Sequence, residues 1–497
     1  MSTLAATPGG EGLLERYFGF AARGTTFARD TMAGATTFVV MSYIIFVNPL
    51  ILTSVTHPPL GQALAFSAVL TSTCLVAGVM SILMGLATNY AYAIAPGLGL
   101  NAVVAFGLVA SGKASYPEAM GLVVLEGVAM VVLAVSGLRE LIFKAIPLEL
   151  KKAIAIGIGL FIAFIGLFNS GIVASVPSSG TPVQLGSFTT WPIFVAVFGL
   201  VFTFALRAIR FRGDLIVGII GATVLATIIN KATSYSAFGH GTDGAVWPGW
   251  HHLYAGPNFH LLGKISLHSF SSTQLGIIAS IVWVFSLFLS DFFDFSGTAI
   301  GVGKQAGYVD SDGNIPNFKK ALVVDGLAAV AGGAASSSSA TTFIESGSGV
   351  AAGGRTGWVA VVVGLLFFPF MFISPLIGMV PKEATAAALV VVGWLMISTL
   401  TEMEGEAEGR SASKLAGIDF HDLAIGLSAA LAIMIMPFTY SITNGIGFGF
   451  ITYTVICAAR REWKRIHPFM WVVSAAFVLY FLVPVLQQHV SWFGGHV

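Results

Sequence analysis

The chain has 497 residues, of which 56% are hydrophobic and only 9% are charged, and its formal net charge is +1. A soluble protein must cover its surface with polar groups and carries about 25% charged residues, so this composition excludes a water-soluble globular domain. The small net charge gives no electrostatic reason to expect nucleic acid as a partner. These values predict an integral membrane protein that crosses the lipid bilayer many times.

Apolar stretches of about 20 residues, long enough to cross a hydrocarbon core of ~30 Å, recur along the chain. A polar and basic stretch, 1–30, precedes the first of them and is expected to be a cytoplasmic tail. Seven membrane spans are then predicted, at 34–54, 64–86, 90–110, 118–138, 149–173, 189–208 and 214–231. A polar stretch rich in Gly, Ser and His, 232–273, follows them and is expected to be an extracytoplasmic loop.

Seven more spans are predicted after this loop, at 274–300, 318–337, 339–352, 357–380, 383–400, 420–437 and 440–459. The C-terminal segment, 461–497, contains one last apolar stretch at 468–486, which is either an additional span or a helix lying in the membrane interface. Lys and Arg gather in alternate loops, as the positive-inside rule requires for fourteen spans with a cytoplasmic N-terminus.

An odd number of spans before the loop means that the second set of seven spans runs upside down relative to the first. The two halves, 31–231 and 274–460, therefore predict an all-α membrane fold built as a 7+7 inverted repeat. Ile-Pro-Leu-Glu at 146–149 and Val-Pro-Lys-Glu at 380–383 open the fifth span of each half. Inverted repeats are typical of transporters whose binding site lies at the repeat interface.

The third span of each half, which is segment 3 or segment 10, contains a stretch that disfavours a continuous helix. Pro96 removes a backbone donor and is followed by Gly97 and Gly99, which predicts an extended entry and a half-helix from about Gly97. The stretch 336–349 is rich in Ser, Thr and Gly, which favour extended or turn conformations. Broken helices at matching positions indicate a transporter's binding site. The alternative is a pair of surface loops between shorter spans.

Two groups of acidic residues fall within these predicted spans. Asp291 and Asp294 share one helical face, and Glu345 lies in the second break. A carboxylate at the bilayer centre costs at least ~2.5 kcal/mol, so it is expected to face water, a partner or a ligand, or to be protonated. A carboxyl group can couple transport to protons and can hydrogen-bond the edge of a purine or pyrimidine. The alternative is a structural ion pair with Arg355 or another buried basic residue.

The remaining motifs do not indicate enzyme chemistry. Cys74 and Cys457 lie far apart in apolar stretches and are expected to be core residues rather than a disulfide or metal ligands. The histidines of the long loop are expected to be solvated. The sequence contains no nucleophile–base arrangement, nucleotide-binding loop or zinc motif, so we expect no enzymatic activity, no metal and no cofactor.

Six stretches in order along the chain resemble the adenine–guanine–hypoxanthine permeases, which are related to the nucleobase–ascorbate transporter superfamily. They are 36–49, 95–102, 294–298, 341–346, 349–357 and 436–442. The resemblance implies a core domain of segments 1–4 and 8–11 and a gate domain of segments 5–7 and 12–14. It also implies proton-coupled uptake of a purine base across the cell membrane, by an elevator movement of the core against the gate, and suggests a homodimer through the gate.

The resemblance also assigns roles to residues. Asp294 and Glu345 stand at the acidic positions of the related uracil permeases and are expected to hold the hydrogen-bonding edge of the base. One of them, with Asp291 as a third candidate, is expected to carry the coupling proton.

The other implied contacts come from the two breaks. Phe343 replaces the Tyr of the uracil permeases and can still stack on a planar base. Asn101 occupies the family's position at the mouth of the half-helix, and Gly99 and Thr342 are expected to line the same site.

Three alternatives to purine transport remain at this point. The first is an anion transporter of sulfate or bicarbonate on the same fold, although carboxylates beside the site argue against it. The second is a pyrimidine or xanthine permease. The third is a membrane receptor or scaffold that transports nothing.

Overall fold

The computed structural model describes residues 12–54, 64–137, 145–176, 181–239, 244–272, 275–308, 315–402 and 417–489. Residues 1–11 of the predicted tail and 490–497 of the predicted C-terminal segment lie outside the described residues. Among the described residues, eight helices are long and apolar enough to cross a membrane, and shorter apolar helices accompany them. The chain is therefore an α-helical, multi-pass membrane protein, while the fourteen-span inverted repeat stays a prediction.

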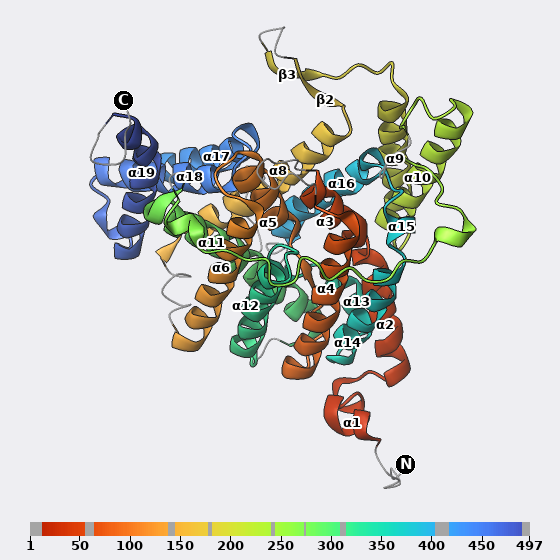
Figure 1. The fold of residues 1–497 in the computed structure, drawn as a ribbon. Coiled ribbons are helices and arrows are strands. Elements are labelled where there is room, and N and C mark those ends of the chain that lie inside the picture. The colour runs from red at the N-terminus through yellow and green to blue at the C-terminus, as the bar shows by residue number, and fades with distance from the viewer. Residues whose placement is uncertain are drawn as a thin grey trace, which may run out of the picture.

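The helices of the first half follow the predicted spans closely (Figure 1). They are α1 (Leu13–Phe18), η1 (Ala21–Arg23), α2 (Phe27–Met41), α3 (Ile44–Thr53), α4 (Phe66–Thr88), α5 (Leu98–Ala102), η2 (Val103–Ala110), α6 (Tyr116–Ser136), α8 (Leu148–Asn169), α9 (Trp191–Ala208) and α10 (Asp214–Ala232). The segment η2 is a π-helix that continues α5.

The described part of the long loop contains two short 3₁₀ turns, and the helices of the second half follow it. They are η4 (Trp250–His252), η5 (His268–Phe270), α11 (Gly276–Ala306), α12 (Phe318–Ala334), α13 (Ser346–Ala351), α14 (Trp358–Phe367), η6 (Phe368–Phe372), α15 (Ser374–Ile377), α16 (Lys382–Glu402), α17 (Leu423–Phe438), α18 (Ile442–Ala459), η7 (Trp463–Arg465) and α19 (Pro468–His489). The final apolar stretch thus forms a helix, α19, which packs against α18 and α11.

The two predicted breaks meet in the interior of the molecule. Strand β1 (Ile94–Pro96) pairs antiparallel with strand β4 (Ala340–Thr342), and every residue of both strands is buried. Short helices follow directly, α5 after β1 and α13 after β4. The expected extended entry and half-helix near Gly97 are confirmed. Since unpaired backbone groups at membrane depth cost several kcal/mol each, the breaks satisfy one another by pairing.

The first span begins earlier than predicted. Helix α2 starts at Phe27, because the Thr26 side chain accepts a hydrogen bond from the Arg29 N–H (3.2 Å) and caps the helix. Asp30, in the first turn, is fully buried and accepts a hydrogen bond from the Thr356 N–H (2.9 Å). The end of the predicted tail 1–30 is therefore part of the packed helical body.

The fifth span ends earlier than predicted. Gly171 adopts a left-handed conformation (φ 77°) directly after α8, and this ends the helix at Asn169. The chain then forms strand β2 (Val173–Val176), which pairs antiparallel with strand β3 (Thr181–Leu185). This hairpin projects from one end of the molecule (Figure 1) and was not predicted.

The helices pack as two groups. The first packing group comprises α2–α6, α11–α14, β1 and β4, in which α6 packs on α12 and α14 packs on α2 and α4. The second packing group comprises α8–α10 and α16–α18, in which α8 packs on α16 and α17. Contacts of α5 with α8 and of α3 with α16 join the two groups.

Close helix packing in the first group depends on paired glycines. A Cβ atom added at Gly85 of α4 would lie 2.3 Å from the carbonyl oxygen of Gly357, and one added at Gly357 would lie 2.0 Å from that of Gly85. The two backbones therefore touch where α4 meets the start of α14, as small residues allow in membrane helices.

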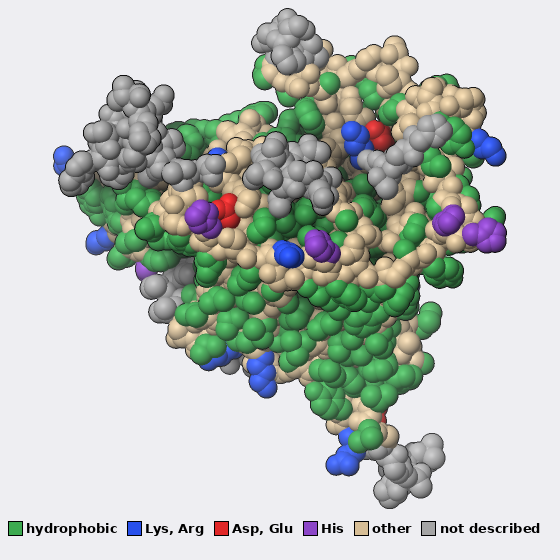
Figure 2. All heavy atoms as spheres, viewed as in Figure 1, with side chains coloured by type: hydrophobic (Ala, Val, Ile, Leu, Met, Phe, Trp, Pro, Cys, Tyr) green, Lys and Arg blue, Asp and Glu red, His purple; other side chains and the backbone are tan. Residues whose placement is uncertain are grey.

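The loop before α11 lies along one end of the first packing group (Figure 1). The Gly263 N–H donates to the Ala334 carbonyl (2.7 Å) at the end of α12, and the Ser266 N–H donates to the Pro117 carbonyl (2.9 Å) of α6. On the face shown in Figure 2, hydrophobic side chains form a broad band, with Lys and Arg at its borders. This surface suits a membrane environment.

Candidate substrate-binding site

A cavity lies where the two packing groups meet. Its volume is about 50 Å³, below the ~300–1,000 Å³ that is usual for sites occupied by small molecules. Residues from both groups line it: Tyr43, Gly97, Leu98, Gly99, Leu100, Ile158, Ser290, Asp294, Thr342, Phe343, Ile344, Glu345, Val392 and Met396. Both predicted breaks therefore contribute to one cavity.

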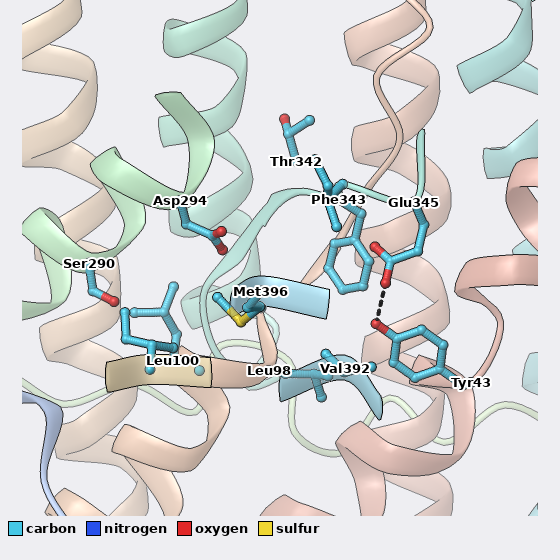
Figure 3. Close-up of a pocket in the computed structure, with 14 residues that line it drawn as sticks. Tyr43, Leu98, Leu100, Ser290, Asp294, Thr342, Phe343, Glu345, Val392 and Met396 are labelled. Carbon is cyan, nitrogen blue, oxygen red and sulfur yellow. Dashed lines mark hydrogen bonds between the residues drawn. The ribbon is translucent and has the colours of Figure 1, made fainter. Parts of the chain in front are cut away.

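The first packing group supplies the polar wall of the cavity (Figure 3). Glu345 follows β4, and its Oε1 accepts a hydrogen bond from the hydroxyl of Tyr43 (2.8 Å). Tyr43 lies in the short interruption between α2 and α3. Glu345 is 7% exposed and Tyr43 only 1%, so this hydrogen bond fixes the carboxyl group in a dry environment.

Asp294 on α11 forms the other acidic part of this wall. It is half-buried and accepts no hydrogen bond from the residues that the structure describes. Figure 3 shows the ring of Phe343 between Asp294 and Glu345. The arrangement places an aromatic surface beside two hydrogen-bonding carboxyl groups, which suits a small planar molecule with polar edges.

The second packing group supplies the apolar wall. Ile158 of α8 and Val392 and Met396 of α16 line the cavity there. A Cβ atom on Gly99 would lie 2.8 Å from Cγ2 of Ile158, so glycine lets α5 approach α8 closely at this boundary. The predicted site residue Gly99 thus lines the cavity and also separates the two groups.

Thr342 lines the cavity, but its hydroxyl is already engaged. Its Oγ1 and its N–H each donate to Oδ1 of Asp325 (both 2.8 Å), and the Thr341 hydroxyl donates to Oδ2 (3.1 Å). Asp325 on α12 therefore holds the strand that carries Thr342. In this arrangement the Thr342 hydroxyl proton is not available to a bound molecule.

Asn101 and Asp291 are buried behind the cavity wall. Both are fully buried, and neither lines the cavity. Neither side-chain polar atom of Asn101 has a hydrogen-bond partner among the described residues. The cavity lining includes Gly99, Asp294, Thr342, Phe343 and Glu345, but it does not include Asn101.

The expectation of only two groups of acidic residues in the spans is wrong. Glu126 on α6 and Asp325 on α12 are also fully buried. The alternative of an ion pair with Arg355 is also wrong, because the Arg355 guanidinium donates to the carbonyls of Val350 and Gly354 (both 2.7 Å). No ion pair joins Asp291 or Asp294 to a basic residue within the described part of the chain.

Comparison with known proteins identifies the family. The profile of a permease family matches residues 29–407. Adenine permease AdeQ of Escherichia coli is 36% identical over 94% of this chain and 96% of its own length. Guanine/hypoxanthine permease PbuG of Bacillus subtilis is 36% identical over 94% of this chain and 99% of its own length. The chain belongs to the purine permease family. Its relatives are permeases, so it is a transporter and not an enzyme.

A solved structure shares the fold of this permease. The transmembrane domain of BicA, a bicarbonate transporter of a cyanobacterium, superposes with a TM-score of 0.58 over 83% of this chain and 96% of that domain. The two sequences are 13% identical, so the likeness concerns the fold alone.

Proposed function

We propose that this permease carries a purine nucleobase, namely adenine, guanine or hypoxanthine, into the cell together with a proton. The observation that carries the proposal is the placement of Asp294 and Glu345 around Phe343 in a cavity between the two packing groups. The names of the relatives, which include adenine and guanine/hypoxanthine permeases, support this substrate class.

The cavity offers each feature that recognition of a purine needs. Ionised carboxyl groups of Asp294 and Glu345 accept hydrogen bonds from the N–H groups at the edge of the base, and Phe343 covers a ring face. Ile158 and Met396 cover the rest of the base with apolar surface. A buried site that hydrogen-bonds N–H groups discriminates strongly against molecules without them, since its acceptors are then left unpaired.

Transport requires the cavity to open to each side of the membrane in turn. We assign the first packing group as the core domain and the second as the gate domain, because every polar side chain that lines the cavity belongs to the first group and the second group contributes only apolar side chains. Movement of the core against the gate carries the substrate with the polar wall and changes the side to which the site opens. The N-terminus is assigned to the cytoplasm, and a homodimer through the gate remains part of this proposal.

Anion transport on the same fold is the less well supported function. The fold likeness to a bicarbonate transporter says nothing about the cargo at 13% identity. Two carboxyl groups in the cavity repel an anion unless both are protonated. We therefore place purine transport first.

Uptake by cells that lack purine permeases tests the function. Cells that express the protein should accumulate labelled adenine or hypoxanthine, excess unlabelled purine should block this uptake, and a protonophore should abolish it. Uracil, sulfate and bicarbonate serve as competitors, and the variant Glu345→Gln at matched membrane expression serves as the site control. Absence of purine uptake and of purine competition, despite confirmed expression, would contradict the proposal.

A further inference from the structure

A second polar cluster lies inside the first packing group, behind the wall of the cavity. It contains Glu126 of α6, Asp291 of α11 and Asp325 of α12, all fully buried. The hydroxyl of Ser339, just before β4, lies 3.5 Å from one oxygen of Asp291. None of the three acidic residues lines the cavity, so the cluster does not contact the substrate directly.

The three carboxyl groups differ in their hydrogen bonding. Asp325 is satisfied by the Thr341 hydroxyl and by the hydroxyl and N–H of Thr342. Glu126 faces Asp291 and Ser339, yet neither of its oxygens has a donor among the described residues. One oxygen of Asp291, Oδ1, also lacks a donor. Glu126 and Asp291 are therefore two adjacent hydrogen-bond acceptors with no donor between them.

No described positive charge compensates this pair. The charged residues nearest on the packed helices are acidic, namely Asp325 on α12 and Asp294 one turn along α11. Two basic residues near the ends of these helices have other partners. Lys319 donates to the Val135 carbonyl (3.1 Å), and the Lys113 ammonium lies over the ring of Trp283, 5.3 Å from the ring centre.

A single proton would satisfy the hydrogen bonding of Glu126 and Asp291. Two carboxylates in contact and away from water repel each other almost without screening. One proton turns either group into a donor for the other and removes the repulsion. A metal ion would need more oxygen ligands, and within the described residues no three acidic, His or Cys side chains converge closely enough to hold one.

We infer that Glu126 and Asp291 share one proton and that this pair is the place where the transported proton is held. This inference rests on the proposed proton symport and adds to it a residue, Glu126, that touches no substrate. Asp291 contacts Ser339, just before β4, and Thr341 within β4, and Asp294 lies one helical turn away on α11. Loss of the proton adds negative charge directly behind the polar wall, which opposes the ionised Asp294 that binds the base. Glu126 is thus a positioning residue for the proton.

Transport by the purified protein in liposomes tests this role with two assays. Exchange of labelled adenine or hypoxanthine across the membrane needs substrate binding and movement, whereas accumulation driven by a pH gradient needs proton coupling as well. One pH unit drives about tenfold accumulation for one proton per base. The variant Glu126→Gln mimics the protonated acid and should keep exchange within about twofold of wild type. It should lose the tenfold accumulation.

The matched control is Glu118→Gln on the same helix. The Glu118 carboxyl accepts a hydrogen bond from the Ser115 N–H (2.8 Å) at the start of α6, a role that glutamine also performs. This variant should keep both exchange and accumulation. Asp291→Asn provides a second test that does not depend on Glu126→Gln folding well, and it should also lose accumulation.

Infrared spectroscopy tests for the proton shared by Glu126 and Asp291 independently of proton-coupled transport. The carbonyl band of a protonated carboxylic acid should be present in the wild type and absent from Glu126→Gln and Asp291→Asn. Wild type could exchange purine without any response to a pH gradient while the band is present. This result would contradict proton symport but support the shared proton.

If Glu126→Gln accumulates purine like wild type, or leaves the infrared band intact, the inference is overturned. Loss of exchange in the folded Glu126→Gln protein would overturn it as well. So would accumulation driven by a sodium gradient in place of a pH gradient.

Discussion

At the scale of single residues, the polar wall consists of two carboxyl groups with different surroundings. Glu345 is held by the Tyr43 hydroxyl at 2.8 Å, whereas Asp294 has no described donor. Glu345 is therefore positioned before a substrate arrives, while Asp294 is free to adapt to the edge of the base. Preorganisation of one contact lowers the entropy that binding must overcome.

Replacing Glu345 with Gln should weaken purine binding severely. The change removes a charged acceptor and places an amide donor against the N–H groups of the base. Because a hydrogen bond to a charged group contributes about 1.5–3 kcal/mol, the Kd of the purified protein for purine should rise about 10- to 100-fold. Titration calorimetry measures this value. Asp291→Asn, behind the wall, should change the Kd far less, and equal mild effects in both variants would remove Glu345 from the site.

Replacing Tyr43 with Phe should have a smaller effect, because it removes only the hydrogen bond that orients Glu345. Since the carboxyl group that contacts the base is still present, we expect a loss of only about 0.5–1.5 kcal/mol, which corresponds to a rise in Kd of about two- to tenfold. Tyr17→Phe is the matched control, since the Tyr17 hydroxyl donates to the Leu86 carbonyl (2.7 Å) at the surface. A Tyr43→Phe protein with unchanged Kd would show that Glu345 needs no such support.

Prediction from sequence reached some of these residues and missed others for a definite reason. Asp294 and Glu345 were found because a carboxyl group within an apolar span demands an explanation. Tyr43 was missed, because tyrosine in a span is an ordinary core or interface residue, and its partner lies 302 positions away. Glu126 and Asp325 carried the same signal as Asp294, but neither lies in one of the six stretches that resemble the permease family.

At the scale of helices and strands, local chemistry decides where the chain departs from a helix. Pro96 and its glycines, and the serines before β4, predicted both breaks from the sequence. The register that pairs Ala95 with Thr341 could not be predicted, because it depends on how distant segments pack. The same holds for Asn101, which was expected at the cavity but is fully buried and does not line it.

Adding a methyl group at Gly85 should destabilise the packing of α4 on α14. The new Cβ would lie 2.3 Å from the Gly357 carbonyl oxygen, and backbone atoms yield little. Overpacking of this kind costs about 1–3 kcal/mol, so Gly85→Ala should unfold in detergent at a lower Tm than wild type. In Gly301→Ala the new Cβ has its nearest neighbour at 4.0 Å, so this change on α11 should leave the Tm unchanged or raise it.

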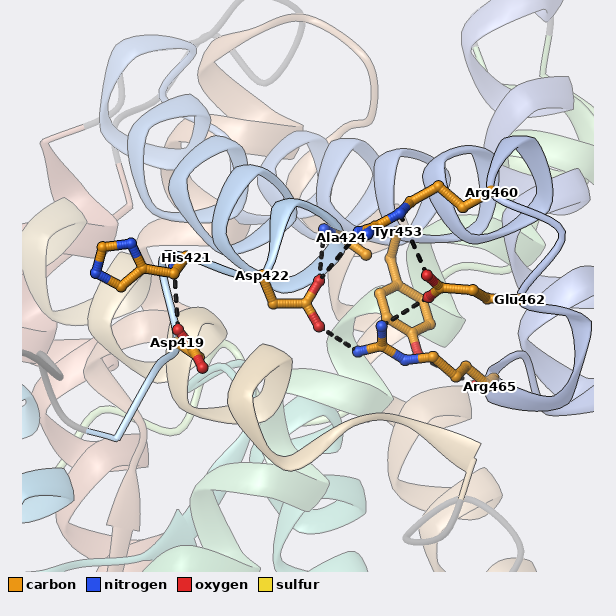
Figure 4. Close-up of polar contacts among 8 residues, drawn as sticks. All are labelled: Asp419, His421, Asp422, Ala424, Tyr453, Arg460, Glu462 and Arg465. Carbon is orange, nitrogen blue, oxygen red and sulfur yellow. Dashed lines mark hydrogen bonds and ion pairs between the residues drawn. The ribbon is translucent and has the colours of Figure 1, made fainter. Parts of the chain in front are cut away.

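An ion-pair cluster joins the start of α17 to the connection between α18 and α19 (Figure 4). Asp422 accepts hydrogen bonds from the Arg465 guanidinium (2.5 Å) and from the Ala424 N–H (3.0 Å). Glu462 accepts from Arg465 (2.7 Å) as well. Partial burial works to raise the pKa of Asp422, but the hydrogen bond from Arg465 outweighs it, so that this pKa lies below its ordinary value.

The contribution of Asp422 to stability should therefore depend on pH in one direction. A lowered pKa in the folded state stabilises the protein above the ordinary pKa of aspartate, about 3.9, and this contribution is lost as the pH falls through the folded-state pKa. The Tm difference between wild type and Asp422→Asn should be constant from about pH 7 to pH 5 and should shrink below about pH 4. A difference that grows on acidification would contradict this sign.

At the scale of the whole molecule, transport depends on the boundary between the two packing groups. Gly99 of α5 faces Ile158 of α8 across this boundary, where a Cβ atom added to Gly99 would lie 2.8 Å from Cγ2 of Ile158. The contact is close enough that one added methyl group must displace a neighbour. Movement of one group past the other should therefore be sensitive to side-chain volume here.

Gly99→Ala should slow purine uptake, and Ile158→Ala in the same chain should restore part of the rate by removing the atom that clashes. Initial rates of uptake for the wild type, both single variants and the double variant form a thermodynamic cycle. The double variant should be faster than the two single effects combined would predict, because Ile158→Ala removes the clash that Gly99→Ala introduces. Additive effects would show that the boundary is not tight at this point.

The division of the cavity between two groups has a consequence for how the protein changes under selection. The hydrogen-bonding groups belong to α11 and the segment after β4, whereas the apolar wall belongs to α8 and α16. Mutants selected for growth on a different base should therefore fall on the first set of segments, and mutants selected for faster turnover on the same base should fall on the second. Substrate preference and transport rate are then two properties that mutation can change independently of each other.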